Sequence, residues 1–355
     1  VGIDGTVLDS IDAEIREGRY GYVDRFLVIR NGRLAYDRRY RNDYDRAYGD
    51  SARISNDMLF HHRTGPYNYY SPWWHPYYRR GNLHTLQSVT KTITSMVIGA
   101  AMNRGDFPSI DTPVLSFFDA DTVVNVDERK RRMTIRHLLT MTSGLDWDEA
   151  RPYSDPENTA NGLEGGYDWV RFTIDRPMME EPGTRFNYSS GASQLLAHVF
   201  HQATGTDVEE YAARYLFGPL GIDDWYWKRT PKGIVDTEGG LYLASEDLAK
   251  LWYLFLRDGE WEGQPIVSPE WVRESVTPAV AVNAGTHYGL KWWLYPNPTD
   301  PSRLVWAGSG FGGQFPLAVP EDDLIVVFNQ WNILDGQARL PFRATLGRIL
   351  RAVTD

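Results

Sequence analysis

Leu86-Gln87-Ser88-Val89-Thr90-Lys91-Thr92 leads into the most apolar run of the chain, residues 88–103, which Gly105 closes. Apolar residues recur along this run at helical spacing, and two more stand on its other sides: Val89, Ile93, Met96, Val97, Ala100 and Ala101, with Ile98 and Met102. The pattern predicts a helix that is buried on nearly all sides. We expect the rest of the fold to be arranged around this helix.

Two polar residues on its first turn have two interpretations. Ser88 stands where the helix macrodipole is positive, and Lys91, three residues on, shares its face. Together they are a candidate nucleophile and base. Alternatively, Ser88 is a helix cap and the Lys91 amine extends to water. The S-x-x-K pattern alone does not choose between these interpretations, because it is common by accident.

Composition limits the classes of partner. The chain has 355 residues, of which 42% are hydrophobic, so it can bury a large core in two domains or in one with a large insertion. A net charge of −10 without a basic run argues against nucleic acid and anionic membranes as partners. No apolar run is long enough to span a bilayer.

Cysteine is absent, which excludes disulfides and thiolate metal sites without identifying a compartment. No signal peptide precedes Val1-Gly2-Ile3, which resembles a processed or trimmed start. A cytoplasmic location and an exported one (periplasmic or secreted) therefore both stay open.

Strand patterns stand at both ends of the chain. Residues 26–36 are two β-rich runs joined by Asn31-Gly32, a strong hairpin signal, and strand-like runs return at 304–306, 315–319 and 324–328. Amphipathic helices are predicted near both termini. We therefore predict an α/β (α+β) fold: an antiparallel sheet flanked by helices, formed by residues 1–107 and 234–355, with an inserted all-helical domain at 108–233.

Residues 41–84 interrupt this pattern. Prolines and the lack of a period predict a loop that holds Phe60-His61-His62-Arg63 and an aromatic stretch at 67–78. The segment is either a lid or aromatic wall over a site, or else a packing flap or subunit contact. Its three histidines (His61, His62 and His75) lack a paired carboxylate and an i,i+4 histidine pair, so we expect no metal site.

Gly308-Ser309-Gly310-Phe311-Gly312-Gly313 has the letters of a dinucleotide fingerprint. That motif must open a helix, whereas these glycines run into a strand-like segment. We reject a nucleotide cofactor here. Glycines along a strand edge instead allow another backbone or a ligand to come close.

Tyr188 precedes a helix and follows a Pro182-Gly183 turn. From its local sequence alone, Tyr188 is interpreted as a tyrosine of the hydrophobic core. Placed near Ser88 and Lys91, its phenol could relay a proton, provided that Lys91 lowers its pKa.

Three segments together resemble one family. Ser88-Val89-Thr90-Lys91 resembles the S-x-x-K of serine β-lactamases and penicillin-binding proteins, and Tyr188-Ser189-Ser190 resembles the Y-x-N of the class C branch. Gly308-Ser309-Gly310 falls where that family has K-T-G. The similarity runs from about residue 24 to the end and implies the β-lactamase/transpeptidase fold, with the site between the sheet and the helical domain.

The departures from the family pattern narrow the function. Ser190 replaces the asparagine of Y-x-N, and Gly308 replaces the lysine of K-T-G. A substrate carboxylate at that point would lack its cation, which is costly unless an arginine such as Arg343 substitutes. Relatives with such changes include family VIII carboxylesterases and 6-aminohexanoate-dimer hydrolases. The S-G-F-G-G-Q run is closest to the hydrolases, and Trp306-Ala307-Gly308 is similar to the W-x-G of the esterases.

The resemblance implies a serine hydrolase that works through an acyl-enzyme without cofactor or metal. Ser88 is the expected nucleophile, Lys91 and Tyr188 the proton acceptors, and the amides of Ser88 and Phe311 the oxyanion hole. Support or substrate contact is expected from Ser190, Gly308, Ser309, Gly310, Trp147, Asp148 and the 67–78 stretch.

The sequence does not decide between small-molecule esters and amides as substrates, and it does not identify the acyl and leaving groups. The oligomeric state is also open, and a dimer is one option. Two rival functions remain: a penicillin-recognising DD-peptidase or β-lactamase, and a catalytically silent binding protein. The presence of Ser88, Lys91 and Tyr188 together argues against the silent protein.

Overall fold

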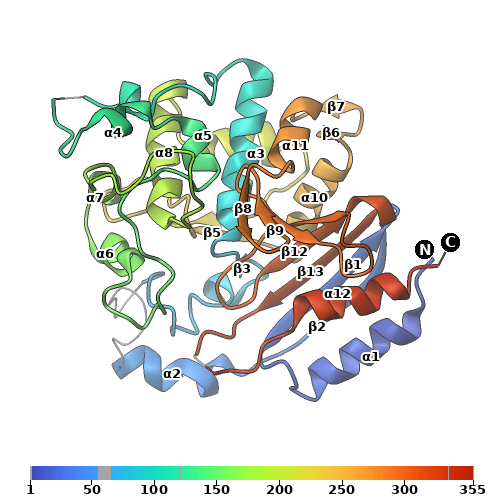
Figure 1. The fold of residues 1–355 in the computed structure, drawn as a ribbon. Coiled ribbons are helices and arrows are strands. Elements are labelled where there is room, and N and C mark those ends of the chain that lie inside the picture. Colours follow the sequence, from blue (N-terminus) through green and yellow to red (C-terminus); the bar gives the residue numbers. More distant parts are fainter. Residues whose placement is uncertain (1, 55–64, 120, 335, 355) are drawn as a thin grey trace.

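The computed structural model describes residues 2–54, 65–119, 121–334 and 336–354. Within these residues the largest sheet has eight strands in the order β2-β1-β13-β12-β11-β10-β9-β8, each antiparallel to its neighbours (Figure 1). The strands are β1 (Val23–Arg30), β2 (Arg33–Arg39), β8 (Val280–Asn283), β9 (Thr286–Tyr288), β10 (Trp293–Pro296), β11 (Leu304–Ala307), β12 (Phe315–Val319) and β13 (Leu324–Gln330). The antiparallel sheet predicted from the sequence is confirmed.

The predicted hairpin forms one edge of this sheet. Asn31 and Gly32 both have positive φ, at 52° and 67°, as a two-residue hairpin turn requires. β1 pairs on its other side with β13, which places Val28 opposite Val326. The first and last parts of the chain therefore share one sheet.

Helices cover both faces of the sheet. α1 (Gly5–Arg16) and α12 (Phe342–Arg351) lie together on one face (Figure 1). Their apolar stripes and the strand residues beneath them form one cluster: Leu8, Ile11, Ile15, Leu346 and Ile349 with Phe26, Val28, Leu317 and Phe328. α10 (Ser245–Leu256) packs on β12 and β13 from the opposite face, in a second cluster.

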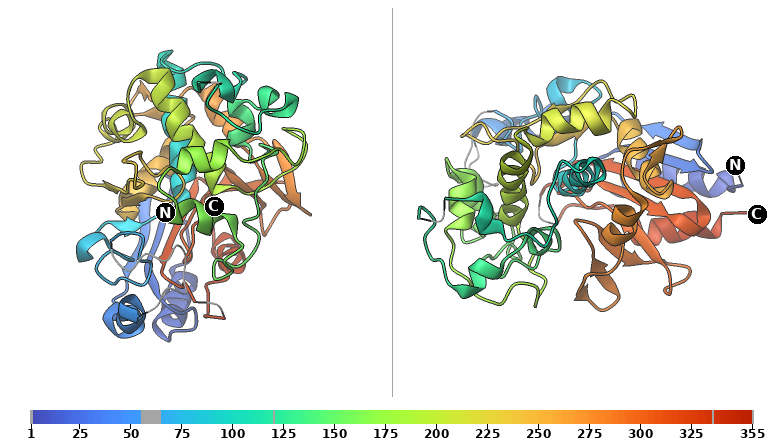
Figure 2. Two further views of the ribbon diagram at one scale, coloured as in Figure 1. Left: turned by 90° about the vertical axis from the view of Figure 1, so that its left-hand side faces the viewer. Right: turned by 90° about the horizontal axis from the view of Figure 1, so that it is seen from above.

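α3 (Val89–Arg104) is the buried helix that the sequence predicts. Every residue from Val89 to Ala101 is buried, and Gly105 ends the helix in the left-handed conformation. At Gly99 the helix is so close to α11 (Pro269–Ser275) that a Cβ atom would lie 2.3 Å from the Trp271 ring. In Figure 1 and in the view from above in Figure 2, α3 stands between the sheet on one side and the green helices on the other.

Residues 108–233 contain mostly short helices. They are η3 (Val114–Phe117), α4 (Glu128–Arg132), α5 (Ile135–Leu139), α6 (Thr159–Gly165), α7 (Trp169–Ile174), α8 (Ser190–Thr204), α9 (Val208–Ala212) and η4 (Ala213–Phe217). The range is not purely helical, because it contains the strand β4 (Tyr226–Trp227). The Tyr226 ring of this strand stacks on Tyr78, with ring centroids 4.0 Å apart. Aromatic packing of this kind favours the extended backbone of a strand over a helix. The domain boundaries themselves stay a prediction.

A small sheet connects this region to the start of α3. β4 pairs with β5 (Leu241–Leu243), and β5 pairs with β3 (His84–Thr85), which leads into Ser88. The remaining short elements are the hairpin of β6 (Glu260–Trp261) and β7 (Gln264–Pro265), and η5 (Pro320–Asp322). No helix in the described part of the chain is both long and apolar enough to cross a membrane.

Residues 41–84 are not a loop throughout, which corrects the sequence prediction. They contain α2 (Tyr44–Ile54) and η2 (Tyr78–Arg80). Tyr44 and Tyr48, four residues apart, give α2 a buried face against Tyr22, with ring centroids 5.5 and 5.8 Å away. Because tyrosines form this face, a search for aliphatic periodicity misses it. His61 and His62 lie outside the described residues.

The aromatic stretch packs into the core. We call its surroundings the aromatic cluster, which contains Tyr44, Tyr48, Tyr67, Tyr69, Tyr70, Trp147, Trp169 and Trp331. Phe311 packs against this cluster, with its ring 6.3 Å from Tyr69 and 6.1 Å from Trp331. The insertion thus supports the glycine segment that follows β11.

Candidate active site

Ser88 and Lys91 face each other at the start of α3. Ser88 occupies the N-cap position, yet its side chain makes no capping hydrogen bond. The Lys91 side chain is only 1% exposed, and its Nζ donates to Ser88 Oγ at 2.9 Å. Neither structural alternative fits, because the serine does not cap the helix and the lysine does not reach water.

The Lys91 ammonium is held from two further directions. It donates to the backbone carbonyl of Glu238 at 2.6 Å and lies 3.2 Å from Oε2 of the same residue. It also donates to Ser190 Oγ at 3.2 Å. Glu238, which is 6% exposed, was not singled out by the sequence, because nothing in its local pattern indicates a contact with a residue so far along the chain.

Tyr188 completes the group. Lys91 Nζ lies 5.1 Å from the centroid of its ring, and the Trp293 ring stacks on it at 5.9 Å. Burial raises the pKa of the Tyr188 phenol, while the charge of Lys91 and hydrogen bonds with Ser88 and Lys91 lower it, and the net pKa is raised. The expected effect of Lys91 is present, but burial outweighs it.

The pKa of Lys91 is also raised. Burial lowers it, but the carboxylates of Glu238 and Glu149, together with the Tyr188 phenolate once that has formed, outweigh burial. Lys91 and Tyr188 therefore form a pair that holds its protons tightly at neutral pH. One of the two must lose a proton before the pair can accept another.

Glu149 is a part of the site that the sequence did not indicate. Its buried carboxylate accepts from both the amide and the hydroxyl of Ser190, each at 2.7 Å. Trp147 Nε1 donates to it at 2.8 Å and the Tyr153 hydroxyl at 3.0 Å. Ser190 Oγ, which accepts from Lys91, thus links the lysine to a fixed negative charge.

Trp147 and Asp148 do not line a substrate space together. Trp147 is buried behind the site, where its indole N–H binds Glu149. The Asp148 carboxylate is 48% exposed and pairs with Arg151 at 2.7 Å. In the sequence, Glu149 appears only as one residue of the acidic run Asp146-Trp147-Asp148-Glu149. Its burial in the fold is what distinguishes its carboxylate from those of its neighbours.

The glycine segment after β11 lies beside the entry to α3. A Cβ atom on Gly310 would lie 2.4 Å from the carbonyl oxygen of Leu86, two residues before Ser88. The close approach expected of this glycine strand is therefore present. In the described part of the chain, the amides of Ser88 and Phe311 donate to no backbone carbonyl. Neither amide is therefore taken up by the backbone hydrogen bonding of the described residues.

Gly308 and Ser309 directly follow β11, not within it as the K-T-G comparison implied, and the Gly308 N–H donates to the Pro316 carbonyl at 3.0 Å. A Cβ atom on Gly308 would lie 3.0 Å from both Trp252 and Pro316, so a larger side chain there would have to displace them. Burial raises the pKa of Tyr295, and a hydrogen bond with Ser309 lowers it, which places these two side chains in contact. Arg343, the substitute cation considered from the sequence, lies over the Tyr295 ring at 5.8 Å.

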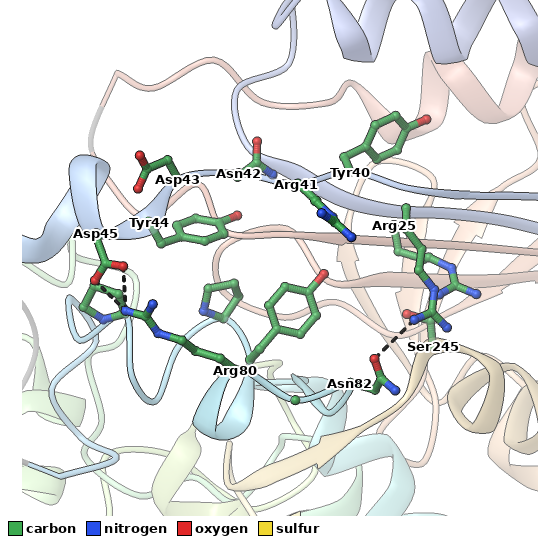
Figure 3. A pocket seen from close by; sticks show the side chains of 15 residues that line it. Arg25, Tyr40, Arg41, Asn42, Asp43, Tyr44, Asp45, Arg80, Asn82 and Ser245 are labelled. Carbon is green, nitrogen blue, oxygen red and sulfur yellow. Dashed lines mark hydrogen bonds and ion pairs between the residues drawn. The ribbon is translucent and has the colours of Figure 1, made fainter.

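Two cavities differ in their relation to this site. The one in Figure 3, of about 510 Å³, is lined by arginines and contains none of Ser88, Lys91 and Tyr188. Its Arg80 donates to both carboxylate oxygens of Asp45, as the dashed lines between them in Figure 3 show. Its Arg39 donates to Asn82 at 3.2 Å. The other cavity, of about 440 Å³, is lined by Phe311 and Tyr153. It also contains none of Ser88, Lys91 and Tyr188, but the hydroxyl of its Tyr153 donates to Glu149 of the site.

The antiparallel sheet and the buried S-x-x-K helix beside it define a fold of the β-lactamase and penicillin-binding-protein class. The chain belongs to the β-lactamase family, whose family model, described as "Beta-lactamase", matches residues 16–344. Solved structures agree on the fold. A family VIII carboxylesterase superposes with a TM-score of 0.66 over 98% of this chain and 96% of its own, at 15% identity. An octameric penicillin-binding protein homologue from Pyrococcus abyssi superposes with a TM-score of 0.66 over 98% and 76%, at 22% identity.

Curated relatives carry different activities. The 6-aminohexanoate-dimer hydrolase of Paenarthrobacter ureafaciens is 25% identical over 283 residues, which are 71% of this chain and 68% of the hydrolase. The monacolin J acid methylbutanoyltransferase of Aspergillus terreus is 28% identical over 155 residues, which are 40% of this chain and 37% of the transferase. The match therefore spans little more than a third of the transferase's length.

Proposed function

We propose that this protein is a serine hydrolase that cleaves small-molecule esters or amides through an acyl-enzyme, as a carboxylesterase or an amidase. The observation that carries the proposal is the 2.9 Å hydrogen bond from the buried Lys91 amine to Ser88 Oγ. A serine that does not cap its helix and a lysine that does not reach water are both available for chemistry. The esterase and hydrolase relatives support the same reaction class.

In the proposed reaction Ser88 Oγ attacks the carbonyl carbon and its proton passes to the Lys91–Tyr188 pair. The pair then delivers that proton to the departing alcohol or amine, and the acyl group stays on Ser88. Water, deprotonated by the same pair, releases the acid and restores the serine. Glu238 and the Ser190–Glu149 link hold the lysine in place through these steps.

The oxyanion that forms on the substrate carbonyl would be bound by the amides of Ser88 and Phe311. A donor of this kind contributes roughly 3 kcal/mol to transition-state stabilisation. Phe311 is well suited to this role because its ring is fixed edge-on by Tyr153 at 5.3 Å and by Tyr69 at 6.3 Å. A preorganised donor of this kind needs no rearrangement when charge develops.

The departure at Gly308 favours this function over that of a penicillin-recognising enzyme. Hydrolysis of a simple ester or amide and reaction with a penicillin both need the serine and the lysine. A penicillin also needs a cation that binds its carboxylate. Any side chain at position 308 would have to shift Trp252 and Pro316, which would lie 3.0 Å from its Cβ atom, and the chain has glycine where that cation would stand.

The test is a hydrolysis panel of short p-nitrophenyl esters, aminohexanoate oligomers and nitrocefin, run on the wild type and on Ser88→Ala. Ser95, a buried serine on α3, gives the control Ser95→Ala. We expect ester or amide turnover that Ser88→Ala abolishes and Ser95→Ala retains. Faster turnover of nitrocefin than of every ester and amide would favour a β-lactamase. Activity that survives Ser88→Ala, or no turnover at all, would end the proposal.

A further inference from the structure

The cavity beside Phe311 has the size of a small-ligand site. Its volume is about 440 Å³, within the range of roughly 300–1,000 Å³ typical of ligand pockets. Its walls bring together aromatic, aliphatic and cationic side chains, among them Tyr70, Tyr153, Phe311, Ile333, Leu334 and Arg339.

Phe311 and Tyr153 connect this cavity to the proposed catalytic group. The Phe311 ring lines the cavity, while its amide is the proposed oxyanion donor. The Tyr153 hydroxyl donates to Glu149, which accepts from Ser190 next to Lys91. Both links run from the wall of this cavity to the group around Ser88 and Lys91.

Part of the wall is apolar and open to solvent. Ile333 is 3% exposed, whereas Leu334 is 40% exposed. A short hydrocarbon chain that covers Leu334 and the Phe311 ring would bury apolar surface on both sides.

The two arginines of the cavity differ in their partners. Arg151 is already neutralised, since it pairs with Asp148 at 2.7 Å, Asp155 at 3.2 Å and Glu157 at 2.9 Å. Arg339 is exposed and forms no ion pair or side-chain hydrogen bond with any residue that the structure describes. Arg339 is therefore the cation of this cavity that is available to an anion.

We infer that the substrate of the proposed hydrolase carries a carboxylate at the far end of a short apolar arm, and that Arg339 binds it. This inference rests on the proposed function. A planar guanidinium binds a carboxylate with two parallel hydrogen bonds, and the aliphatic arm covers Leu334 on the way to it. Arg339 thus supplies, farther from the scissile bond, the cation that is missing at Gly308. The substrate carboxylate would lie correspondingly farther from the scissile bond than the carboxylate of a penicillin does.

Matched substrates test this inference kinetically. For the acyl arm the pair is mono-p-nitrophenyl adipate and p-nitrophenyl hexanoate, and for the leaving-group arm it is 4-acetoxybenzoate and phenyl acetate. We expect Arg339→Gln to lower kcat/KM about fivefold for the charged member of one pair, the size of effect a solvent-exposed ion pair produces, and to leave the neutral member unchanged. Raising the salt concentration should weaken the wild-type preference in the same direction.

Arg343→Gln is the matched control, because Arg343 is also exposed but lies over the Tyr295 ring and does not line this cavity. The inference fails if the wild type prefers neither charged ester, if Arg339→Gln leaves both ratios unchanged, or if Arg343→Gln removes the preference instead.

A binding measurement separates this inference from the proposed function. Adipate and hexanoate are titrated into the wild type and Arg339→Gln, and binding is followed by NMR, without any turnover. Tighter binding of adipate by the wild type, lost in Arg339→Gln, supports the anion site even if no ester is hydrolysed. Equal binding of adipate by both proteins overturns it even if Ser88-dependent hydrolysis is found.

Discussion

The Ser190 hydroxyl donates a hydrogen bond of 2.7 Å to the buried carboxylate of Glu149. The same hydroxyl accepts from Lys91 at 3.2 Å. Glu149 therefore acts on the proposed base through Ser190, although the carboxylate itself touches neither Ser88 nor Lys91 by a direct hydrogen bond. It is a positioning residue, and its charge raises the pKa of both Lys91 and Tyr188.

Glu149→Gln should lower activity and shift its pH dependence. The Glu149 carboxylate accepts four hydrogen bonds from described residues, two on each oxygen. In glutamine an NH2 group replaces one of these oxygens and cannot accept the two hydrogen bonds that reach it. We expect a loss of about tenfold in kcat/KM at high pH, together with a midpoint moved to lower pH because the charge that raises both pKa values is gone. The pH–rate profile measures both effects. Asp148→Asn, at the exposed neighbour, should change neither, and an unshifted midpoint in Glu149→Gln would contradict the link.

Hydrolysis should rise with pH well into the alkaline range. The pair acts as a base only after it has lost a proton, and the pKa values of Lys91 and Tyr188 lie above their ordinary values of 10.5 and 10.0. The active fraction therefore grows as pH rises, and kcat/KM should keep increasing to at least about pH 9. The pH profile is obtained from the hydrolysis rate of the wild type at each pH, after the rate of Ser88→Ala at the same pH has been subtracted. A plateau already reached near neutral pH would mean that another group is the base.

Gly310→Ala should damage the site more than the fold. The added Cβ would lie 2.4 Å from the Leu86 carbonyl oxygen, so the backbone that carries Phe311 has to move away from Ser88. We expect kcat/KM to fall at least about tenfold, since even one misplaced oxyanion donor costs that much. Gly165→Ala, at a helical glycine whose Cβ would meet nothing within 4 Å, should keep full activity. If Gly310→Ala is as active as Gly165→Ala, the glycine segment does not supply the oxyanion donor.

Lys291→Met should stabilise the protein, and more so at lower pH. Lys291 is buried, its amine donates to Ser193 Oγ at 2.9 Å, and burial lowers its pKa well below the ordinary value, helped by the charge of Lys91. The folded state must therefore release a proton that the unfolded chain keeps, and this cost grows as pH falls below the unfolded pKa. Thermal melts at pH 6 and pH 9 should show a larger gain in Tm at pH 6. Lys250→Met, at a partly buried lysine paired with Asp247, is the control, and an equal gain at both pH values would contradict a neutral Lys291.

The sequence predicted the residues whose local pattern is informative. Ser88 and Lys91 share a helix face, and the buried helix after them could be read from spacing alone. Tyr188 was found by its place in an ordered set of motifs, and it does lie against Lys91. The glycine segment was predicted to permit close approach, and Gly310 does approach Leu86.

The sequence could not predict the partners that come from distant segments. Glu149 and Glu238 are ordinary acidic residues until the fold buries them around Lys91. Arg339 becomes notable only because the fold places it on a cavity next to Phe311. α2 was missed for a different reason, since its buried face consists of Tyr44 and Tyr48 instead of aliphatic residues.

The central claim is that Ser88 forms the acyl-enzyme. The most direct measurement is mass spectrometry of the intact protein and of its peptides after treatment with a fluorophosphonate. The account predicts a single adduct on the peptide that contains Ser88, at full stoichiometry, with no adduct on Ser88→Ala and normal labelling of Ser95→Ala. An adduct on any other residue, or labelling that persists in Ser88→Ala, would contradict it.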